Sequence, residues 1–389
     1  MYKIQTLNKI AHIGTNILDK NKYEIGTTAE NPDAILVRSA NMLEMELPAS
    51  LKAIARAGAG VNNIPVDRCS EKGIVVFNTP GANANAVKEL AIAALLLSSR
   101  KIVSGINWVK GLPLDADFTK EVENGKSAFS GPELFGKKLG VIGLGAVGAM
   151  TANAATDLGM EVYGYDPYIT VDGAWMLHRS VKKASDIKVI FEKCDFITLH
   201  IPSTPETRGI INAKTIESMK QGMRIINLSR GDLVNNTEIA VALERGKIAC
   251  YLTDFPSEEI MRMKNVVAIP HLGASTPESE DNCAVMAVNE LIDFLENGNI
   301  KNSVNFPDTI NPRGGDESIC VIHKNVPNML AQISAALSGV SLNIENLSSR
   351  SKKEYAYSVF EIFGECPGSI AEKLNSIDGV LRVNIIRNK

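Results

Sequence analysis

Three polar residues in the second half of the chain have the types needed to move a proton next to a carboxylate. Arg230 lies in Asn-Leu-Ser-Arg-Gly, Glu259 follows 29 residues later, and His271 lies in Pro-His-Leu-Gly-Ala-Ser-Thr. Histidine changes charge near neutral pH and exchanges a proton in both directions, and a carboxylate beside it fixes its orientation. A guanidinium offers a planar fork to a carboxylate and polarises a neighbouring oxygen. The set predicts hydride transfer at the carbon next to a carboxylate.

A glycine-rich loop upstream predicts a dinucleotide site. Gly143-Leu144-Gly145-Ala146-Val147-Gly148 follows an apolar strand predicted over 139–142 and precedes small residues that can form a helix. The first glycine permits a sharp turn, the second lets the backbone approach a pyrophosphate, and the third lets helix and strand pack closely. Asp166, 18 residues after Gly148, ends the next predicted strand, where a carboxylate accepts from ribose hydroxyls and repels a 2′-phosphate. We therefore expect NAD, with a structural glycine turn beside a solvated aspartate as the alternative.

The elements that must position these residues alternate between short apolar strands and helices, which indicates a parallel α/β fold. Helices are predicted over 89–106 and 277–296, and a surface loop over 111–136. Strands are predicted over 34–38, 53–56, 74–77, 139–142, 161–165, 196–199, 224–227, 249–253 and 266–269. The last six form a doubly wound sheet, and Arg230, Glu259 and His271 all follow strands of it, at the edge where ligands bind in open sheets.

Bulk properties exclude several classes of protein. The 389 residues are 45% apolar and 22% charged, with a net charge of −3 and no strongly basic block, so nucleic acid has little electrostatic reason to bind. The apolar run 90–97 is too short to span a bilayer, and the N-terminus lacks a secretory pattern. The six cysteines form no C-x-x-C pair, which favours buried thiols in a reducing compartment over disulfides or zinc. We expect a cytoplasmic protein without a metal, membrane or nucleic-acid partner.

Taken together, these motifs resemble the D-isomer-specific 2-hydroxyacid dehydrogenases over about Ile35 to Phe306. The resemblance implies Arg230, Glu259 and His271 as the catalytic set and NAD as the cofactor. It places at the cofactor Gly143, Gly145, Ala146, Val147, Gly148, Asp166, His200, Pro202, Thr204, Ser229, Asp254, Gly273 and Ala274. For His200, a hydrogen-bonded histidine at a strand end is the alternative. One departure is Ile260, which follows Glu259 where relatives usually carry proline.

Two segments near the N-terminus resemble the branch of this family that acts on 3-phosphoglycerate. They are Val37-Arg38-Ser39-Ala40 and the segment 56–63. The resemblance implies that Arg38 takes the substrate phosphate and that the backbone at Gly58, Ala59 and Gly60 holds the carboxylate. Arg38 could equally form a structural ion pair with a nearby acid. The chain departs from the branch at Asn62, usually aspartate, and further on at Lys88, usually small and apolar, which adds an anion contact or only decorates a helix start.

The C-terminal part of the chain reads strand, helix, strand, strand, helix, strand, the order of a ferredoxin-like unit. Residues 319–386 resemble an ACT domain, a regulatory module that binds amino acids between paired copies. The resemblance implies His323, Asn325 and Asn343 as ligands of L-serine, with a pure oligomerisation module as the alternative. The implied domains are a substrate-binding domain at 1–98 and 276–305, an NAD-binding Rossmann domain at 99–275, a linker at 306–317 and the ACT domain at 318–389.

The resemblance as a whole implies NAD-dependent oxidation of D-3-phosphoglycerate to 3-phosphohydroxypyruvate, the first step toward L-serine. It also implies a homo-oligomer, paired through NAD domains or further through ACT domains. A glyoxylate or hydroxypyruvate reductase of the same family is one alternative. A non-catalytic dinucleotide sensor or corepressor, and an amino-acid sensor with a vestigial dehydrogenase body, are the others.

Overall fold

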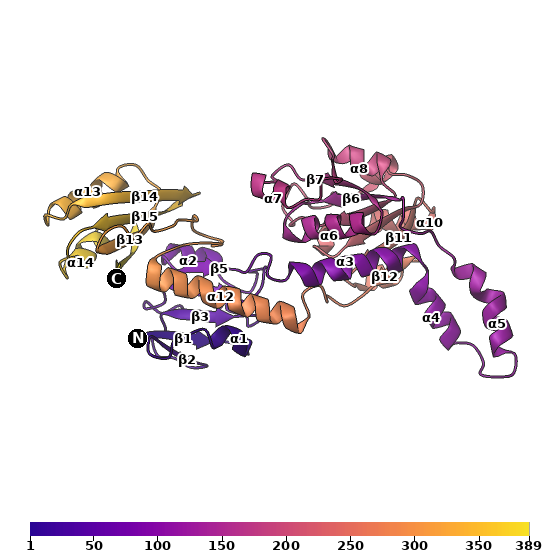
Figure 1. The fold of residues 1–389 in the computed structure, drawn as a ribbon, viewed down its shortest axis with the longest axis horizontal. Coiled ribbons are helices and arrows are strands. Elements are labelled where there is room, and N and C mark those ends of the chain that lie inside the picture. The colour runs from indigo at the N-terminus through magenta and orange to yellow at the C-terminus, as the bar shows by residue number, and fades with distance from the viewer. Residues whose placement is uncertain (389) are drawn as a thin grey trace. The chain divides into compact units, whose positions relative to one another are not determined.

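The computed structural model describes residues 1–388, which divide into two compact units (Figure 1). The first unit joins Met1–Asn83 to Thr276–Lys389, and the second is Ala84–Ser275. Within residues 1–388, no helix has the length and apolar character to cross a membrane. The same residues hold no cluster of three or more potential metal ligands, and all six cysteines are free thiols.

A five-stranded parallel sheet lies in the first unit. Its strands, in sheet order, are β2 (Tyr23–Gly26), β1 (Tyr2–Thr6), β3 (Ala34–Val37), β4 (Ala53–Arg56) and β5 (Val75–Phe77). Short helices α1 (His12–Thr15) and α2 (Val66–Glu71) accompany it, and the long α12 (Pro277–Asn297) returns to it late in the chain. Gly14 of α1 lies against Ala284 of α12 so closely that a Cβ would meet its backbone. The helix predicted over 277–296 is confirmed as α12.

The second unit contains a seven-stranded sheet whose pairings are all parallel. In sheet order the strands are β12 (Val266–Ala268), β11 (Ile248–Thr253), β10 (Met223–Asn227), β9 (Phe196–Leu199), β6 (Lys138–Ile142), β7 (Glu161–Tyr165) and β8 (Lys182–Lys183). The chain winds outward in both directions from β6 and β9. This doubly wound order creates a switch point between those two strands, where open sheets bind ligands.

Helices and helical turns connect the strands of this second sheet. They are α3 (Ala84–Ser99), α4 (Ile102–Lys110), α5 (Phe118–Gly125), η1 (Lys126–Phe129), α6 (Ala146–Asp157), α7 (Val171–Trp175), α8 (Ile187–Lys193), α9 (Ala213–Ser218), η2 (Gly231–Leu233), α10 (Asn236–Glu244) and α11 (Glu258–Met261). Buried Ala91, Ala94 and Leu95 of α3 belong to the core of this unit. The compact unit therefore begins at Ala84, whereas the sequence placed the domain boundary between 98 and 99.

Two predictions about this unit are wrong. The single helix predicted over 89–106 is two helices, α3 and α4, which break at Arg100 and Lys101. The segment 111–136, expected to be a loop, contains α5 and η1 and forms a pair with α4 (Figure 1). Contacts with α4 stabilise this segment, because the Trp108 ring of α4 lies 5.1 Å from the Phe129 ring and covers Gly125. The eight residues of α5 contain only two large apolar side chains, Phe118 and Val122, too few for a sequence pattern to reveal the helix.

The C-terminal module has the predicted ferredoxin-like order. It consists of β13 (Glu317–Lys324), α13 (Met329–Ser338), β14 (Ile344–Lys352), β15 (Tyr355–Ile362), α14 (Ile370–Asn375) and β16 (Val380–Arg387). The antiparallel sheet has the order β14-β15-β13-β16. Along β13, Ile319 and Val321 face the module's helices, whereas Cys320 and Ile322 join the core that includes α12. This period of two gives the sheet two buried faces within the first unit.

Candidate active site

The glycine loop in the second unit has the geometry that a pyrophosphate requires. Gly143 has φ +90 and lies against the His200 carbonyl, and Gly148 lies against the Gly143 carbonyl, so neither position has room for a Cβ. Gly145 is different, because a Cβ there would meet no atom within 4 Å. The first and third glycines are therefore required by packing, whereas the second faces open space. The loop can approach a bulky anion at Gly145.

Helix α6 begins directly after Gly145, so Ala146, Val147 and Gly148 form its first turn. Gly145 is the N-cap and no side chain caps the helix, which leaves backbone N–H groups available to an anion. Asp166 follows β7 and accepts hydrogen bonds from the Leu144 N–H at 2.8 Å and the Tyr168 N–H at 2.9 Å. Its carboxylate thus holds the glycine loop and keeps lone pairs for a ribose. These residues fit a dinucleotide.

His200, after β9, is a neutral histidine. Its Nε2 lies 3.0 Å from the Thr198 hydroxyl, and burial lowers the pKa of His200 to about 4. The His200 N–H also donates to Ile142 in the neighbouring strand β6. This geometry matches the interpretation of His200 as a hydrogen-bonded histidine at a strand end, and it supports the turn at Gly143.

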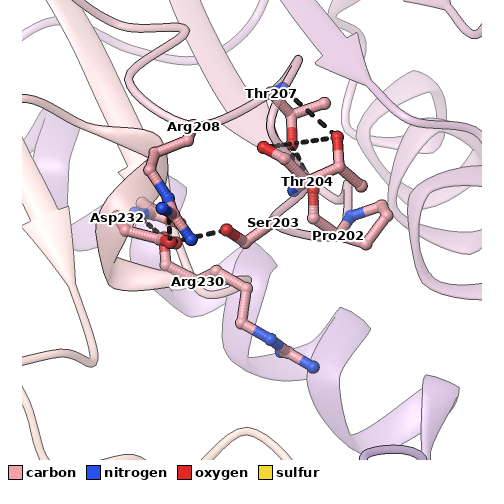
Figure 2. A network of polar contacts seen from close by, with 8 residues as sticks. Pro202, Ser203, Thr204, Thr207, Arg208, Arg230 and Asp232 are labelled. Carbon is pink, nitrogen blue, oxygen red and sulfur yellow. Dashed lines mark hydrogen bonds and ion pairs between the residues drawn. The ribbon is translucent and has the colours of Figure 1, made fainter.

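The loop that follows His200 is held by the network in Figure 2. The Thr207 hydroxyl accepts from the Thr204 N–H at 2.8 Å and donates to the Pro202 carbonyl at 2.7 Å. Ser203 and Arg208 both donate to Asp232, and the Ser203 hydrogen bond is the main cause that lowers the pKa of Asp232. The loop carrying Pro202 and Thr204 is therefore fixed to the segment that follows Arg230.

Arg230 lies just beyond the end of β10. The Asn227 side chain donates to the Arg230 carbonyl at 2.8 Å, and the Ser229 hydroxyl donates to the Ile201 carbonyl at 2.7 Å. These bonds fix the backbone, while the side chain is exposed and makes one contact to the Ser229 carbonyl at 2.6 Å. Figure 2 shows the guanidinium extending away from the Ser203–Asp232–Arg208 network. Its fork can therefore bind a carboxylate without breaking that network.

His271 and Asp254 form an ion pair at the same edge of the sheet. His271 Nδ1 lies 3.2 Å from Asp254 Oδ2, with the histidine side chain 63% exposed and the aspartate side chain fully buried. Neither Asp254 oxygen accepts a well-aligned hydrogen bond. Burial raises the pKa of the Asp254 carboxyl, and the charges of His271 and Arg230 offset part of that effect. The arrangement can hold an imidazole with its Nε2 exposed to a substrate.

The two residues after His271 that the sequence assigned to the cofactor border this pair. Gly273 is buried, and a Cβ there would lie 3.5 Å from Val87 and 3.8 Å from Asp254 Oδ2. Ala274 is half-buried beside it. A Cβ at 273 would thus make ordinary van der Waals contacts with Val87 and Asp254.

Glu259 does not contact His271. It lies on α11, where its carboxylate accepts from the Asn236 amide at 3.2 Å and the Thr237 hydroxyl at 3.4 Å. It lines a cleft of about 510 Å³ together with Ala240, Glu244, Glu258, Arg262, Met263 and Lys264. The carboxylate that the sequence led us to expect beside His271 is present, but Asp254 provides it.

The expected substrate-binding residues of the first unit lie near one another. Arg38 forms an ion pair with Glu280 at 2.7 Å, which is the structural pairing that the sequence left open. The loop at Gly58, Ala59 and Gly60 is held through all three carbonyls, which accept from the Thr79 N–H, the Asn78 amide and the Arg56 guanidinium respectively.

Sequence reasoning missed the supporting residues Arg56 and Asn78, as well as Asn8, whose side chain accepts from the N–H groups of 38–40. No local pattern could have marked Asn8, because it lies 30 residues before the segment it holds. Lys88, whose role the sequence left open, lies 3.9 Å from Glu89, a long and partly exposed pairing.

Two of the three expected effector residues border one small cavity in the C-terminal module. His323 and Asn325 line a space of about 260 Å³ with Asn328, Ser349 and Ser351 among others. Both ring nitrogens of His323 already have hydrogen-bond partners, because Nδ1 lies 2.8 Å from the Lys324 carbonyl and Nε2 lies 2.8 Å from the Ser358 hydroxyl. Asn343 lies just before the first residue of β14, whereas the cavity is lined by Ser349 and Ser351 near the last residue of that strand. Asn343 does not line the cavity.

Comparisons with known proteins agree with the fold and the glycine loop. Residues 92–273 match the family described as "D-isomer specific 2-hydroxyacid dehydrogenase, NAD binding domain". A D-3-phosphoglycerate dehydrogenase of Synechocystis is 34% identical over 326 residues, covering 79% of this chain and 56% of that protein. One of Haemophilus influenzae is 29% identical, covering 88% of this chain and 83% of that protein.

A solved structure, the NAD+-bound 3-phosphoglycerate dehydrogenase of Entamoeba histolytica, superposes with a TM-score of 0.61 at 27% identity. It covers 78% of this chain and 98% of its own. The chain spans about half the length of the first curated relatives that it matches. The domain at residues 92–273, which contains the glycine loop, is an NAD-binding domain of the D-isomer specific 2-hydroxyacid dehydrogenase family.

Proposed function

We propose that this protein oxidises D-3-phosphoglycerate to 3-phosphohydroxypyruvate with NAD, the first step toward L-serine. The observation that carries the proposal is the ion pair of His271 with buried Asp254, at the edge of the same sheet whose glycine loop fits a dinucleotide. Curated relatives named D-3-phosphoglycerate dehydrogenase support the choice of substrate.

Our assignment for the cofactor uses residues of the second unit. The open space at Gly145 and the first turn of α6 would hold the pyrophosphate, and Asp166 would accept from the adenosine ribose. Pro202, Thr204, Ser229, Asp254, Gly273 and Ala274 would border the nicotinamide half. When bound, the nicotinamide supplies the acceptor for the hydride that leaves C2 of the substrate.

Two side chains perform the remaining chemistry. His271, with Nδ1 toward Asp254, presents Nε2 to remove the proton of the C2 hydroxyl as the carbonyl forms. Arg230 binds the substrate carboxylate with its fork and polarises the C2 oxygen. In the reverse direction the same imidazole, now protonated, returns the proton. Both side chains are exposed, as a site that exchanges substrate with solvent requires.

For the phosphate end we propose Arg38, assisted by the backbone around Gly58, Ala59 and Gly60. Arg38 is paired with Glu280, and both side chains are partly exposed. An exposed pair of this kind contributes at most about 1 kcal/mol. A phosphate dianion, with twice the charge and three acceptor oxygens, can therefore displace Glu280 from the guanidinium.

We further propose L-serine as an effector of the C-terminal module and a cytoplasmic homo-oligomer as the working form. Asn325 lines the small cavity beside His323, whereas Asn343 lies away from it in the same copy. A second copy that supplies Asn343 would complete the site. The free thiols of the chain fit a reducing compartment.

The deciding experiment is NADH formation from D-3-phosphoglycerate at alkaline pH, with a trap for the keto product and with or without L-serine. Turnover that L-serine suppresses supports both parts of the proposal. Turnover that ignores L-serine retains the dehydrogenase and rejects the effector. Faster reduction of glyoxylate or hydroxypyruvate than of the phosphorylated keto acid would favour the reductase alternative. Folded protein that binds NADH but turns over none of these acids would favour the sensor.

A further inference from the structure

We infer that Lys88 of α3 is a further substrate-binding residue of this chain, whose ammonium group contacts an anionic oxygen of the bound acid. The inference deepens the proposed function and rests on it for the identity of that acid. The sequence left two interpretations of Lys88, an anion contact and a solvated side chain at a helix start. Three observations favour the anion contact: the face of α3 on which Lys88 lies, its burial, and its lack of a close partner.

Lys88 lies on the face of α3 that packs into the core of the second unit. Three residues of this helix, Ala84, Ala91 and Leu95, are buried on that face. Lys88 is four residues after the first of them, three before the second and seven before the third, so all four share one helical stripe. The Lys88 side chain is accordingly only 21% exposed, whereas that of the next residue, Glu89, is 65% exposed. A lysine that only covered the helix surface would lie on the side of Glu89.

Among residues 1–388, the ammonium group of Lys88 has no close partner. Its one ion pair is with Glu89 at 3.9 Å, which exceeds the range of about 2.7–3.2 Å for an N–H···O hydrogen bond. The same Glu89 oxygen already accepts from the Asn85 amide at 2.9 Å. An ammonium group has three donors, and burying them without acceptors costs free energy. Lys88 therefore has donors available to an anion that enters this region.

Contacts near the two ends of α3 show which edge of the sheet the helix points to. Near its C-terminus, the Ser98 carbonyl accepts from the guanidinium of Arg224, the second residue of β10, at 2.9 Å. Near its N-terminus, Val87 lies 3.5 Å from the place that a Cβ would take at Gly273, two residues after His271. Helix α3 therefore runs antiparallel to the strands. Its N-terminus lies at the carboxyl edge of the sheet, beside the segment that carries His271.

The Lys88 side chain is directed toward that carboxyl edge. Side chains of an α-helix lean toward its N-terminus, and Lys88 is the fifth residue of α3. The positive end of the helix dipole lies at the same place. Arg230, after β10, brings a second cation to this edge from another element. Two cations from separate elements favour an acid with more than one anionic group over a simple monocarboxylate.

The cofactor is the other source of an anion near α3. This helix also packs against α6, whose first turn we assigned to the pyrophosphate. The contact of Val87 with the Gly273 position, however, brings the first turn of α3 to the His271 segment. We therefore assign the ammonium group of Lys88 to the substrate, and a loss of cofactor affinity would contradict the assignment.

The test compares Lys88→Met, which keeps an unbranched stem without the charge, with Lys88→Arg, which keeps the charge. In oxidation of D-3-phosphoglycerate, Lys88→Met should raise KM by about 10-fold or more, the value of a charged hydrogen bond. Its kcat should change by less than about 3-fold, because the contact is made equally before and during the reaction. Lys88→Arg should recover most of the affinity. Lys188→Met, at an exposed position of α8, is the matched control with wild-type KM.

Competing ligands identify the anion. Glycerol 3-phosphate has the phosphate without the carboxylate, and D-glycerate has the carboxylate without the phosphate. Lys88→Met should raise the inhibition constant of one of them by about 10-fold and leave the other unchanged. NADH affinity, measured by fluorescence, should equal that of the wild type. Unchanged KM and inhibition constants overturn the inference, and so does weaker NADH binding with an unchanged KM.

A second readout uses the wild-type chain and needs no turnover. Lys88 is acetylated with a limiting amount of an N-hydroxysuccinimide ester in the presence of NADH, and its modified fraction is measured by mass spectrometry. Saturating D-3-phosphoglycerate should slow the acetylation of Lys88 and leave that of Lys188 unchanged. Equal acetylation of Lys88 with and without the acid overturns the inference, even where Lys88→Met does not fold. Protection of Lys88 without any turnover would retain the anion contact and reject the proposed function.

Discussion

His271 and His323 lie near strand ends in different parts of the molecule, and their surroundings are opposite. The His271 side chain is 63% exposed and has one ionic partner, Asp254. His323 is 3% exposed, and both of its ring nitrogens have partners within the module. Its Nδ1 faces a carbonyl and so must donate, which leaves Nε2 to accept from Ser358, whose oxygen in turn lies 2.8 Å from the Ser349 hydroxyl.

This difference teaches that a histidine motif predicts chemistry only where the ring keeps a free nitrogen. Burial lowers the pKa of His323, so the ring stays neutral and its hydrogen bonds hold β13 to β15. At the edge of the other sheet, a buried carboxylate lies against Nδ1 of His271, and most of the histidine side chain is exposed. The His323 ring therefore shapes the wall of the proposed effector cavity, and Asn325 remains the donor and acceptor that a small zwitterion could contact.

The largest loss of turnover is expected when His271, the histidine with an exposed ring nitrogen, is replaced. His271→Asn should lower turnover by about 100-fold or more while NADH binding persists, because only proton transfer is lost. Steady-state rates and NADH fluorescence would measure the two properties. His178→Asn, at an exposed position in the same unit, is the matched control. Near-normal turnover of His271→Asn would show that the exposed histidine is no more catalytic than the buried one.

The exposed guanidinium of Arg230 should be next in importance. Arg230→Lys keeps the charge but loses the planar fork, so we expect kcat/KM to fall by about 10-fold to 100-fold, the value of a charge-assisted hydrogen bond. Initial rates over a range of substrate concentration would measure it. Arg262→Lys, at an exposed site of the same unit, should change little. Equal kcat/KM for Arg230→Lys and wild type would remove the carboxylate fork from the mechanism.

A change beside His323 should affect stability. Ser358→Ala leaves the buried Nε2 of His323 without a donor, which should lower the free energy of unfolding by about 1–3 kcal/mol. Urea unfolding followed by circular dichroism would measure the loss. Ser376→Ala removes an exposed hydroxyl bond in the same module and should cost less than about 0.5 kcal/mol. Equal stability of the two variants would mean that the saturated histidine is not structural.

A further effect on stability concerns a buried carboxyl that extends the comparison. Glu290 of α12 is 8% exposed, one of its oxygens has no partner, and burial raises its pKa to about 8. The folded state then binds a proton that the unfolded state releases above its lower pKa, so this contribution to stability is complete at acidic pH. It is lost as the pH rises toward about 8, by at most about 1.4 kcal/mol for each pH unit.

Glu290→Gln should flatten that pH dependence, because an amide is neutral at every pH. Thermal unfolding of the variant and the wild type between about pH 5 and pH 8 would show it. Glu278→Gln, at an exposed position of the same helix, provides the control and should keep the wild-type slope. Parallel curves for Glu290→Gln and wild type would mean that Glu290 is ionised despite its burial.

Local rules predicted much of the fold and the geometry of the glycine loop. The strands β7 and β9 have the predicted bounds, because short apolar runs bordered by polar turns are typical of buried parallel strands. The requirement for Gly143 and Gly148 also follows from local geometry, since each lies against a carbonyl and leaves no space for a side chain. Strands β1 and β2 were missed, because their exposed and half-buried positions lack a continuous apolar run.

Other features depended on contacts between distant residues. Asn8 holds a segment 30 residues away, and Glu280 reaches Arg38 only because α12 returns to the first sheet. Helix α5 depends on the Trp108 ring, which covers Gly125 and contacts Phe129. Such partners have no fixed spacing in sequence, so periodicity and motif matching do not identify them.

The sequence by itself determined that an arginine, a histidine and carboxylates would meet at the edge of a dinucleotide-binding sheet, because the ends of parallel strands share one edge. Only the tertiary structure decided which carboxylate reaches the histidine. Asp254 is held there by the register of β11 and β12, whereas the Ser257 cap and buried Ile260 turn Glu259 toward α10. Spacing along a chain sets the edge at which a side chain lies, and the packing of the next turn sets the direction in which it points.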